Sequence, residues 1–242
     1  MRALTANDAI SIWESGQRQR PAERSVAVLS AVFPETSRVD LRRLTLGQCN
    51  GRLWEIRNRI FGAEVKGFSE CANCGERLEF SLDAAGLEVV EGSNTEHRLE
   101  INDYTVRFRL LTLEDLNAVA ASADMETARE RLLERCVIEA GYKGELVAVS
   151  ELPPKVTEEL GRQLAEFDSG CDVLIDLSCP ACDSSYEIPF DISSFLYTEI
   201  SAQAQRLLRE VHVLARAYGW QERDILGMST RRRQFYLQML ER

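Results

Sequence analysis

CANCGERLEFSLD, residues 71–83, and CPACDSSYEIPFD, residues 179–191, are two copies of one short pattern. Each copy begins with a Cys-x-x-Cys pair and continues into residues that alternate between apolar and polar, which is typical of a strand. The agreement extends beyond the cysteines to the acidic residue that ends each stretch, so the sequence indicates a repeated structural unit. The alternating apolar positions correspond one to one: Leu78 with Tyr186, Phe80 with Ile188, and Leu82 with Phe190.

The four cysteines of the two copies are predicted to hold one structural zinc ion: Cys71, Cys74, Cys179 and Cys182. Zinc prefers four soft ligands in a tetrahedron, and one Cys-x-x-Cys turn, or knuckle, supplies two thiolates. Two knuckles together fill the coordination shell and leave no open position for a substrate. Gly75 and Asp183 follow the two pairs at a place where the chain often needs a positive φ. Zinc would join segments distant in sequence, so its removal should loosen the middle of the chain.

Three other roles for the paired cysteines are weaker. A thioredoxin-like redox pair opens a helix after a strand, whereas strand-like residues follow both pairs here. A zinc deaminase needs a His-x-Glu motif, and His97 is followed by Arg98 and Leu99. An iron–sulfur cluster also takes four thiolates, so the sequence leaves iron open beside zinc.

Composition favours a soluble cytoplasmic protein that binds neither membranes nor, broadly, nucleic acid. The 242-residue chain has a net charge of −10, whereas non-specific nucleic-acid affinity comes from Lys and Arg that neutralise phosphates. No apolar run approaches the roughly 18 residues of a membrane span, and the N-terminus lacks the pattern of a secretion signal. Seven cysteines in such a chain argue against a disulfide framework. The three outside the pairs, Cys49, Cys136 and Cys171, are expected to be buried thiols.

Helical periodicity dominates the rest of the chain, around a predicted β-hairpin whose turn is Asn102-Asp103. Helices are expected after Pro21, from Thr45 to Gly62, after Thr112, from Asp124 to about Ala140, and after Pro154. The longest helix is expected to begin at a cap formed by Ser193 or Ser194 and to end at Gly219, with two short helices beyond it.

These elements predict an α+β protein that is mostly helical, with a small split zinc-ribbon-like β unit formed by the two knuckles and a β-hairpin. The expected divisions are an N-terminal helical region (1–62), the split unit (63–192) and a C-terminal helical region (193–242). A hairpin and helical insertion would occupy about 97–168, inside the split unit.

Nothing in the sequence indicates an enzyme or a small-molecule substrate. The two histidines, His97 and His212, are interpreted as structural or solvent-facing, and no GxSxG, phosphate-cradling glycine loop or HExxH motif occurs. Glu126, Glu130 and Glu134 stand at helical spacing among arginines, which indicates a solvated face with i,i+4 ion pairs.

One dense basic run, Arg231-Arg232-Arg233, falls in the first turn of a helix that Ser229 would cap. Positive charge at that end opposes the helix dipole, so stability alone does not explain the run. An acidic surface on a partner is one explanation and a solvated face is another. Trp, Tyr and Arg dominate binding hot spots, which makes Trp220, Arg231, Arg232 and Tyr236 candidate partner-binding residues. Packing of Trp220 on the long helix is the alternative for that residue.

Four stretches together resemble the T-even-type baseplate hub assembly chaperone family of contractile phage tails and contractile injection systems. They are TLGQCNGRLWEIRNRIFG (45–62), the two knuckle stretches, and YGWQERDILGMSTRRRQFYLQML (218–240). The resemblance extends from about Leu41 to the end, although Cys49 and Asn50 stand where relatives tend to carry an Arg-Asp pair. It implies a non-enzymatic cytoplasmic protein that helps baseplate hub or spike proteins to assemble. A zinc-ribbon regulator that binds nucleic acid is the alternative from a different class.

Overall fold

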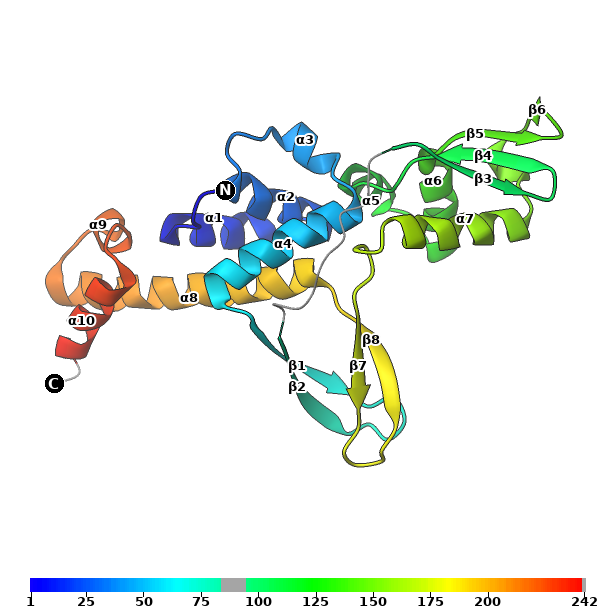
Figure 1. Cartoon of the computed structure of the whole chain (residues 1–242). Coiled ribbons are helices and arrows are strands. Elements are labelled where there is room, and N and C mark those ends of the chain that lie inside the picture. Colours follow the sequence, from blue (N-terminus) through cyan, green and yellow to red (C-terminus); the bar gives the residue numbers. More distant parts are fainter. Residues whose placement is uncertain (84–94, 241–242) are drawn as a thin grey trace. The chain divides into compact units, whose positions relative to one another are not determined.

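The computed structural model describes residues 1–83 and 95–240, and it confirms the predicted α+β class with mostly helical content (Figure 1). Contacts group the chain into two compact units, one formed by Met1–Glu35 with Ser193–Arg242 and the other by Thr36–Ile192. The three-part division made from the sequence stays a prediction, and residues 84–94 of its middle part lie outside the described residues. No helix in the described ranges combines the length and apolarity needed to cross a bilayer.

The first unit is helical. α1 and α2 are joined by hydrogen bonds to α8, since the Tyr197 hydroxyl donates to Trp13 O at 3.2 Å and the Ser25 and Ser193 hydroxyls lie 2.6 Å apart. The Arg24 guanidinium also lies over the Tyr197 ring, 4.3 Å from its centroid. The elements are α1 (Ala6–Gly16), α2 (Pro21–Val32), α8 (Ile192–Tyr218), α9 (Glu222–Leu226) and α10 (Thr230–Leu240).

The ends of these helices largely follow the prediction. α2 begins with Pro21, and α8 ends where Gly219 N donates to Ala215 O. The predicted serine cap of α8 is wrong, because the helix begins at Ile192, ahead of both serines. Phe190 N still donates to Val173 O, so the extended pairing continues almost to the helix start and places the serines inside the first turn.

The second unit contains small antiparallel sheets and short helices. Two of the sheets are two-stranded hairpins that carry the knuckles, β1 (Glu64–Glu70) with β2 (Arg77–Asp83), and β7 (Leu174–Ser178) with β8 (Ser185–Pro189). The third sheet has the order β3 (His97–Ile101), β4 (Tyr104–Phe108), β5 (Val137–Tyr142) and β6 (Glu145–Leu146). The helical elements are α3 (Arg38–Arg42), α4 (Leu46–Phe61), α5 (Leu113–Val119), α6 (Met125–Cys136), η2 (Val149–Glu151) and α7 (Pro154–Phe167).

The helix predicted from Asp124 to about Ala140 is only partly correct. Asp124 caps α6 as expected, but the helix ends at Cys136 and Val137–Tyr142 continues as strand β5, which pairs with β4. Val137 and Ile138 are β-branched, and the β3–β4 hairpin offers a free edge, so the tertiary pairing outweighs the helical periodicity. The predicted turn at Asn102-Asp103 is confirmed, with φ values of 48° and 65°.

A buried carboxylate holds this sheet to its helices. Arg109 donates to both oxygens of Asp115, at 2.7 and 3.0 Å, and Arg135 Nε donates to Asp115 Oδ1 at 2.8 Å. Burial opposes the charged form, yet hydrogen bonds from Arg109, Thr112 and Arg135 together lower the pKa of Asp115 to about 2. The network therefore joins α5, α6 and the residue that follows β4 through one ionised side chain.

A second buried carboxylate joins the end of α7 to the start of α4. Asp168 Oδ2 accepts from Gly47 N at 3.0 Å, and Asp168 Oδ1 accepts from the Thr45 hydroxyl at 3.2 Å. A Cβ on residue 47 would collide with that carboxylate, which explains a glycine near the beginning of a helix. Thr45 and Gln48 form the capping box of α4.

Candidate metal centre

The two knuckles have the same backbone hydrogen bonds. In the first, Cys71 N donates to Glu76 O and Gly75 N donates to Cys71 O, each at 2.9 Å. In the second, Cys179 N donates to Ser184 O at 2.9 Å and Asp183 N donates to Cys179 O at 2.8 Å. Each knuckle is the turn of a β-hairpin, because strands precede as well as follow the cysteines. The repeat inferred from the sequence is therefore larger than predicted and includes β1 and β7.

The backbone conformation after each pair is the one expected. Gly75 has a φ of 74° and Asp183 has a φ of 55°. A positive φ costs little free energy at glycine, and less at Asn or Asp than at most other residues. This conformation turns the chain so that the N–H groups of Glu76 and Ser184 hydrogen-bond to the sulfurs of Cys74 and Cys182, respectively.

The four cysteines lie together, and their knuckles form the tips of the β1–β2 and β7–β8 hairpins (Figure 1). All four sulfurs lie within 4.8 Å of one another. Between the knuckles, Cys71 Sγ lies 3.7 Å from Cys182 Sγ and Cys74 Sγ lies 3.6 Å from Cys179 Sγ. A tetrahedron with zinc–sulfur bonds of about 2.3 Å has sulfur–sulfur edges of about 3.8 Å. The cluster thus has the donor set and the spacing to hold a metal ion.

The thiols of the cluster ionise unequally. Asn73 Nδ2 donates to Cys182 Sγ at 3.5 Å, and this bond, with the backbone of Ser184, lowers the pKa of Cys182 to about 6. The backbone of Glu76 favours the Cys74 thiolate, but desolvation and the neighbouring thiols raise the pKa of Cys74 to about 12. Several thiolates at this separation repel one another, so full ionisation of the cluster requires a cation among them.

Side chains at equivalent positions of the repeat support the cysteines. One small apolar cluster contains the buried residues Cys71, Leu78 and Cys179. Tyr186, which stands at the position of the repeat that corresponds to Leu78, packs against this cluster. At the other end of the second hairpin, Phe190 stacks on Trp54 of α4 with ring centroids 5.2 Å apart. The second hairpin is therefore held at both of its ends, by the apolar cluster at the cysteines and by the Trp54–Phe190 stack.

A family model described as "T4 bacteriophage base plate protein" matches residues 15–197. The chain belongs to this family. No curated protein and no solved structure matches the chain significantly. The matched range includes both knuckles of this base plate protein, and it begins earlier than the resemblance inferred from the sequence, which started at about Leu41.

Three cysteines of this base plate protein are not among the four whose sulfurs lie together. Cys49 and Cys136 are buried as predicted, whereas Cys171 is only partly buried. Desolvation raises the pKa of Cys136 and of Cys171 to about 12. These thiols are protonated at neutral pH and are poor metal ligands or nucleophiles.

The candidate partner-binding residues lie beyond the family match, on α10 and the turn before α9. Trp220 stacks on Tyr218 at a centroid distance of 4.5 Å and meets Tyr236 edge-on at 4.8 Å. The Arg232 guanidinium lies 5.8 Å from the centroid of the Tyr236 ring, and Arg231 is exposed. The structure thus brings Trp220, Arg232 and Tyr236 together.

Two features of α10 were missed or misinterpreted from the sequence. Arg233 is buried and pairs with Glu210 of α8, with Arg233 Nε donating to Glu210 Oε2 at 3.0 Å. Stability therefore explains one of the three arginines, contrary to the interpretation above. Phe235 and Met239, at 61% and 54% exposure, were missed although their i,i+4 spacing marks one helical face.

Proposed function

We propose that this base plate protein is a non-enzymatic assembly chaperone for the hub or spike of a contractile phage tail or contractile injection system, held together by a structural zinc ion. The observation that carries the proposal is a four-cysteine centre formed by two remote hairpins in a chain of the base plate family. A closed centre of this kind shapes a scaffold and leaves no coordination position for catalysis.

Zinc is the metal that the centre fits best. Four thiolates at tetrahedral spacing suit zinc or iron, and zinc needs no redox partner. Cys71, Cys74, Cys179 and Cys182 would hold it. The ion would supply the positive charge that the thiolates lack and would join two hairpins that otherwise share a small apolar contact. Most of the binding free energy would then act as folding free energy for the second unit.

The surface proposed to meet the partner is formed by Trp220, Arg231, Arg232 and Tyr236, with Phe235 and Met239 added from the structure. Exposed aromatic and apolar side chains next to arginines are the composition of a protein-binding hot spot. Because Arg233 is occupied by Glu210, the basic surface is smaller than the sequence suggested. This favours a protein partner over the nucleic-acid alternative, which needs several phosphate contacts.

Co-expression with the hub and spike proteins of the same gene cluster, followed by pull-down, tests the proposal. The variant Arg231→Glu/Arg232→Glu should lose most of the captured partner. The matched control Arg206→Glu/Arg209→Glu makes the same charge change on exposed positions of α8 and should retain it. If wild-type protein captures neither partner and deletion of its gene leaves particle yield unchanged, the chaperone proposal is wrong.

A further inference from the structure

One side of α10 combines positive charge with exposed apolar side chains. Each residue of a helix turns the chain by about 100°, so Phe235 and Met239 project side by side, with Arg231 on one flank and Arg232 on the other. Both apolar side chains are more than half exposed, and both arginines are exposed. We call these four residues the α10 ridge. Its apolar part is about 6 Å long, at a rise of 1.5 Å per residue.

Contacts on the other side of α10 hold the helix in place. Arg233, which is buried, pairs there with Glu210 of α8. The ring of Tyr236 meets Trp220 edge-on, and Trp220 in turn stacks on Tyr218 at the end of α8. The ridge is therefore presented in a fixed orientation, which lowers the entropic cost of binding a partner.

Stability of the chain does not account for the ridge. In the described part of the chain, Arg233 is the arginine of α10 that pairs with a carboxylate, whereas Arg231 and Arg232 have no acidic partner. Both lie in the first turn of the helix, where positive charge opposes the helix dipole. Phe235 and Met239 leave apolar surface in water. A partner that supplies carboxylates together with apolar surface would reverse both unfavourable effects.

The distribution of charge along the chain favours an acidic partner. Residues 201–240 contain seven arginines and three acidic residues, a formal charge of +4, in a chain whose net charge is −10. The rest of the chain therefore carries −14. An acidic partner is attracted to the C-terminal helices and repelled elsewhere, so the charges select the surface that it meets. A partner with a positive surface would be drawn away from the ridge.

The form of the ridge indicates which kind of segment it binds. An added β-strand needs unpaired backbone groups, and the backbone of a helix interior offers none. Side chains at i,i+4 spacing form a row that fits between the rows of a second helix. We propose that the α10 ridge docks an amphipathic helix of a protein partner, with an apolar row flanked by carboxylates. The apolar row packs on Phe235 and Met239. The carboxylates pair with Arg231 and Arg232. This inference rests on the C-terminal surface proposed above and specifies the chemistry of its partner.

Three matched peptides test the inference. The probe is a fluorescein-labelled, amidated peptide of three Glu-Leu-Ala-Glu-Leu-Ala-Glu repeats, which places its leucines on one face of a helix. A second peptide has glutamine in place of every glutamate, and a third has the same composition with the leucines scattered around the helix. Fluorescence anisotropy is measured as full-length protein is added in about 150 mM salt, where exposed charges are screened beyond roughly 8 Å. The first peptide should bind saturably, and each of the others at least tenfold more weakly.

Variants locate the binding and separate its two components. Arg231→Gln/Arg232→Gln should weaken the acidic peptide about tenfold and leave the glutamine peptide unchanged, because only the acidic peptide can use the arginines. Phe235→Gln/Met239→Gln should weaken both peptides. The matched control Arg206→Gln/Arg209→Gln removes two exposed arginines of α8 and should leave all binding unchanged. All substituted side chains are exposed, so the variants should keep the fold.

Several results would overturn the inference. They are failure of the acidic peptide to bind wild-type protein, equal binding of the glutamine peptide, and equal weakening by the α8 control. Binding of a DNA duplex or of anionic lipid vesicles through Arg231 and Arg232, without binding of the acidic peptide, would assign the ridge to a different class of partner. Self-association abolished by Arg231→Gln/Arg232→Gln, again without peptide binding, would assign it to a second copy of this chain.

The inference and the chaperone proposal can fail separately. Capture of a hub or spike protein that Arg231→Gln/Arg232→Gln leaves intact would overturn the assignment of the ridge and leave the chaperone proposal standing. Peptide binding as expected, together with no capture of either protein, would support the ridge as a binding site for acidic helices and count against the hub and spike as its partners.

Discussion

Replacing Arg233 with alanine should release α9 and α10 from α8. The Arg233 and Glu210 side chains are only 5% and 7% exposed. Arg233 Nη1 also donates to Met228 O at 2.6 Å, and Gln234 Nε2 donates to Glu210 Oε1 at 2.7 Å. The substitution would therefore leave Glu210 as a buried carboxylate that has lost its cation, while the turn before α10 loses a hydrogen bond.

The expected magnitude separates the three neighbouring arginines. Removing one partner of a buried ion pair costs about 3–5 kcal/mol. Arg232→Ala removes an exposed side chain near the Tyr236 ring and should cost about 0.5 kcal/mol. Replacing both members of the pair, as in Glu210→Leu/Arg233→Leu, should recover much of the loss, because no charge is then left buried without a partner.

Hydrogen exchange followed by mass spectrometry measures this effect locally. Amides of α9 and α10 should exchange at least 100-fold faster in Arg233→Ala than in wild type, whereas those of α4 should be unaffected. The double leucine variant should restore most of the protection. Equal protection of α10 in Arg233→Ala and Arg232→Ala would refute the assignment of Arg233 as structural and Arg232 as a surface residue.

Three further predictions concern the second unit. The folded pKa of Asp115, about 2, is below the usual 3.8, so its stabilisation is present above about pH 4 and is lost as the pH falls towards 2. Asp115→Asn should lower the free energy of unfolding in urea by about 2 kcal/mol at pH 7. The variant should also lose less stability than wild type between about pH 4 and pH 2. An unchanged loss of stability over this range would contradict the network. Gly47→Ala should destabilise by about 1–3 kcal/mol through the clash with Asp168, whereas Gly161→Ala, inside α7 with open space around it, should stabilise by about 1 kcal/mol in the same assay. Chelation of the metal should speed hydrogen exchange in the β1–β2 and β7–β8 hairpins, and unchanged exchange there would show that the metal does not join them.

Much of the second unit could be predicted because local signals and tertiary contacts agree. The capping box of Thr45, the positive φ after each cysteine pair and the turn at Asn102-Asp103 are determined by nearby residues. The four-cysteine cluster was predictable because the repeat continues beyond the cysteines, with Leu78 and Tyr186 at matching places.

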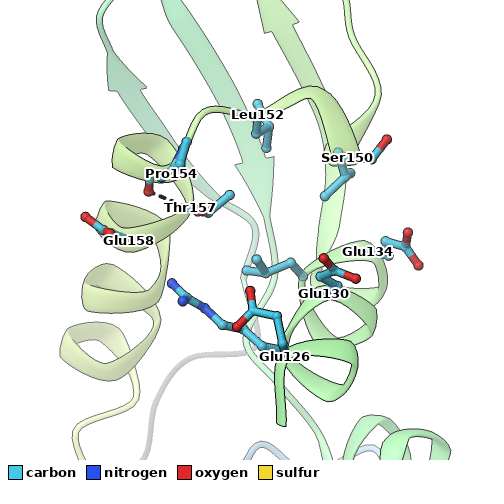
Figure 2. A pocket seen from close by; sticks show the side chains of 11 residues that line it. Glu126, Glu130, Glu134, Ser150, Leu152, Pro154, Thr157 and Glu158 are labelled. Carbon is cyan, nitrogen blue, oxygen red and sulfur yellow. Dashed lines mark hydrogen bonds between the residues drawn. The ribbon is translucent and has the colours of Figure 1, made fainter. Parts of the chain in front are cut away.

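The remainder depends on contacts that the sequence does not display. Val137–Tyr142 continues the helical periodicity of α6, but it pairs with the edge of β4 and forms a strand. Arg233 looks like its neighbours until Glu210, on another helix, is placed beside it. The glutamates of α6 are exposed as predicted, but the pocket that they line together with η2 and α7 depends on tertiary packing (Figure 2). In each case the deciding partner is distant in sequence.

Native mass spectrometry of the purified protein tests the central claim, that two remote hairpins share one metal ion. Wild-type protein should carry one zinc per chain, and Cys71→Ser and Cys179→Ser, one from each hairpin, should each lose it. Cys171→Ser, outside the cluster, should keep it. Full zinc in either hairpin variant, or two ions per wild-type chain, would contradict a shared centre.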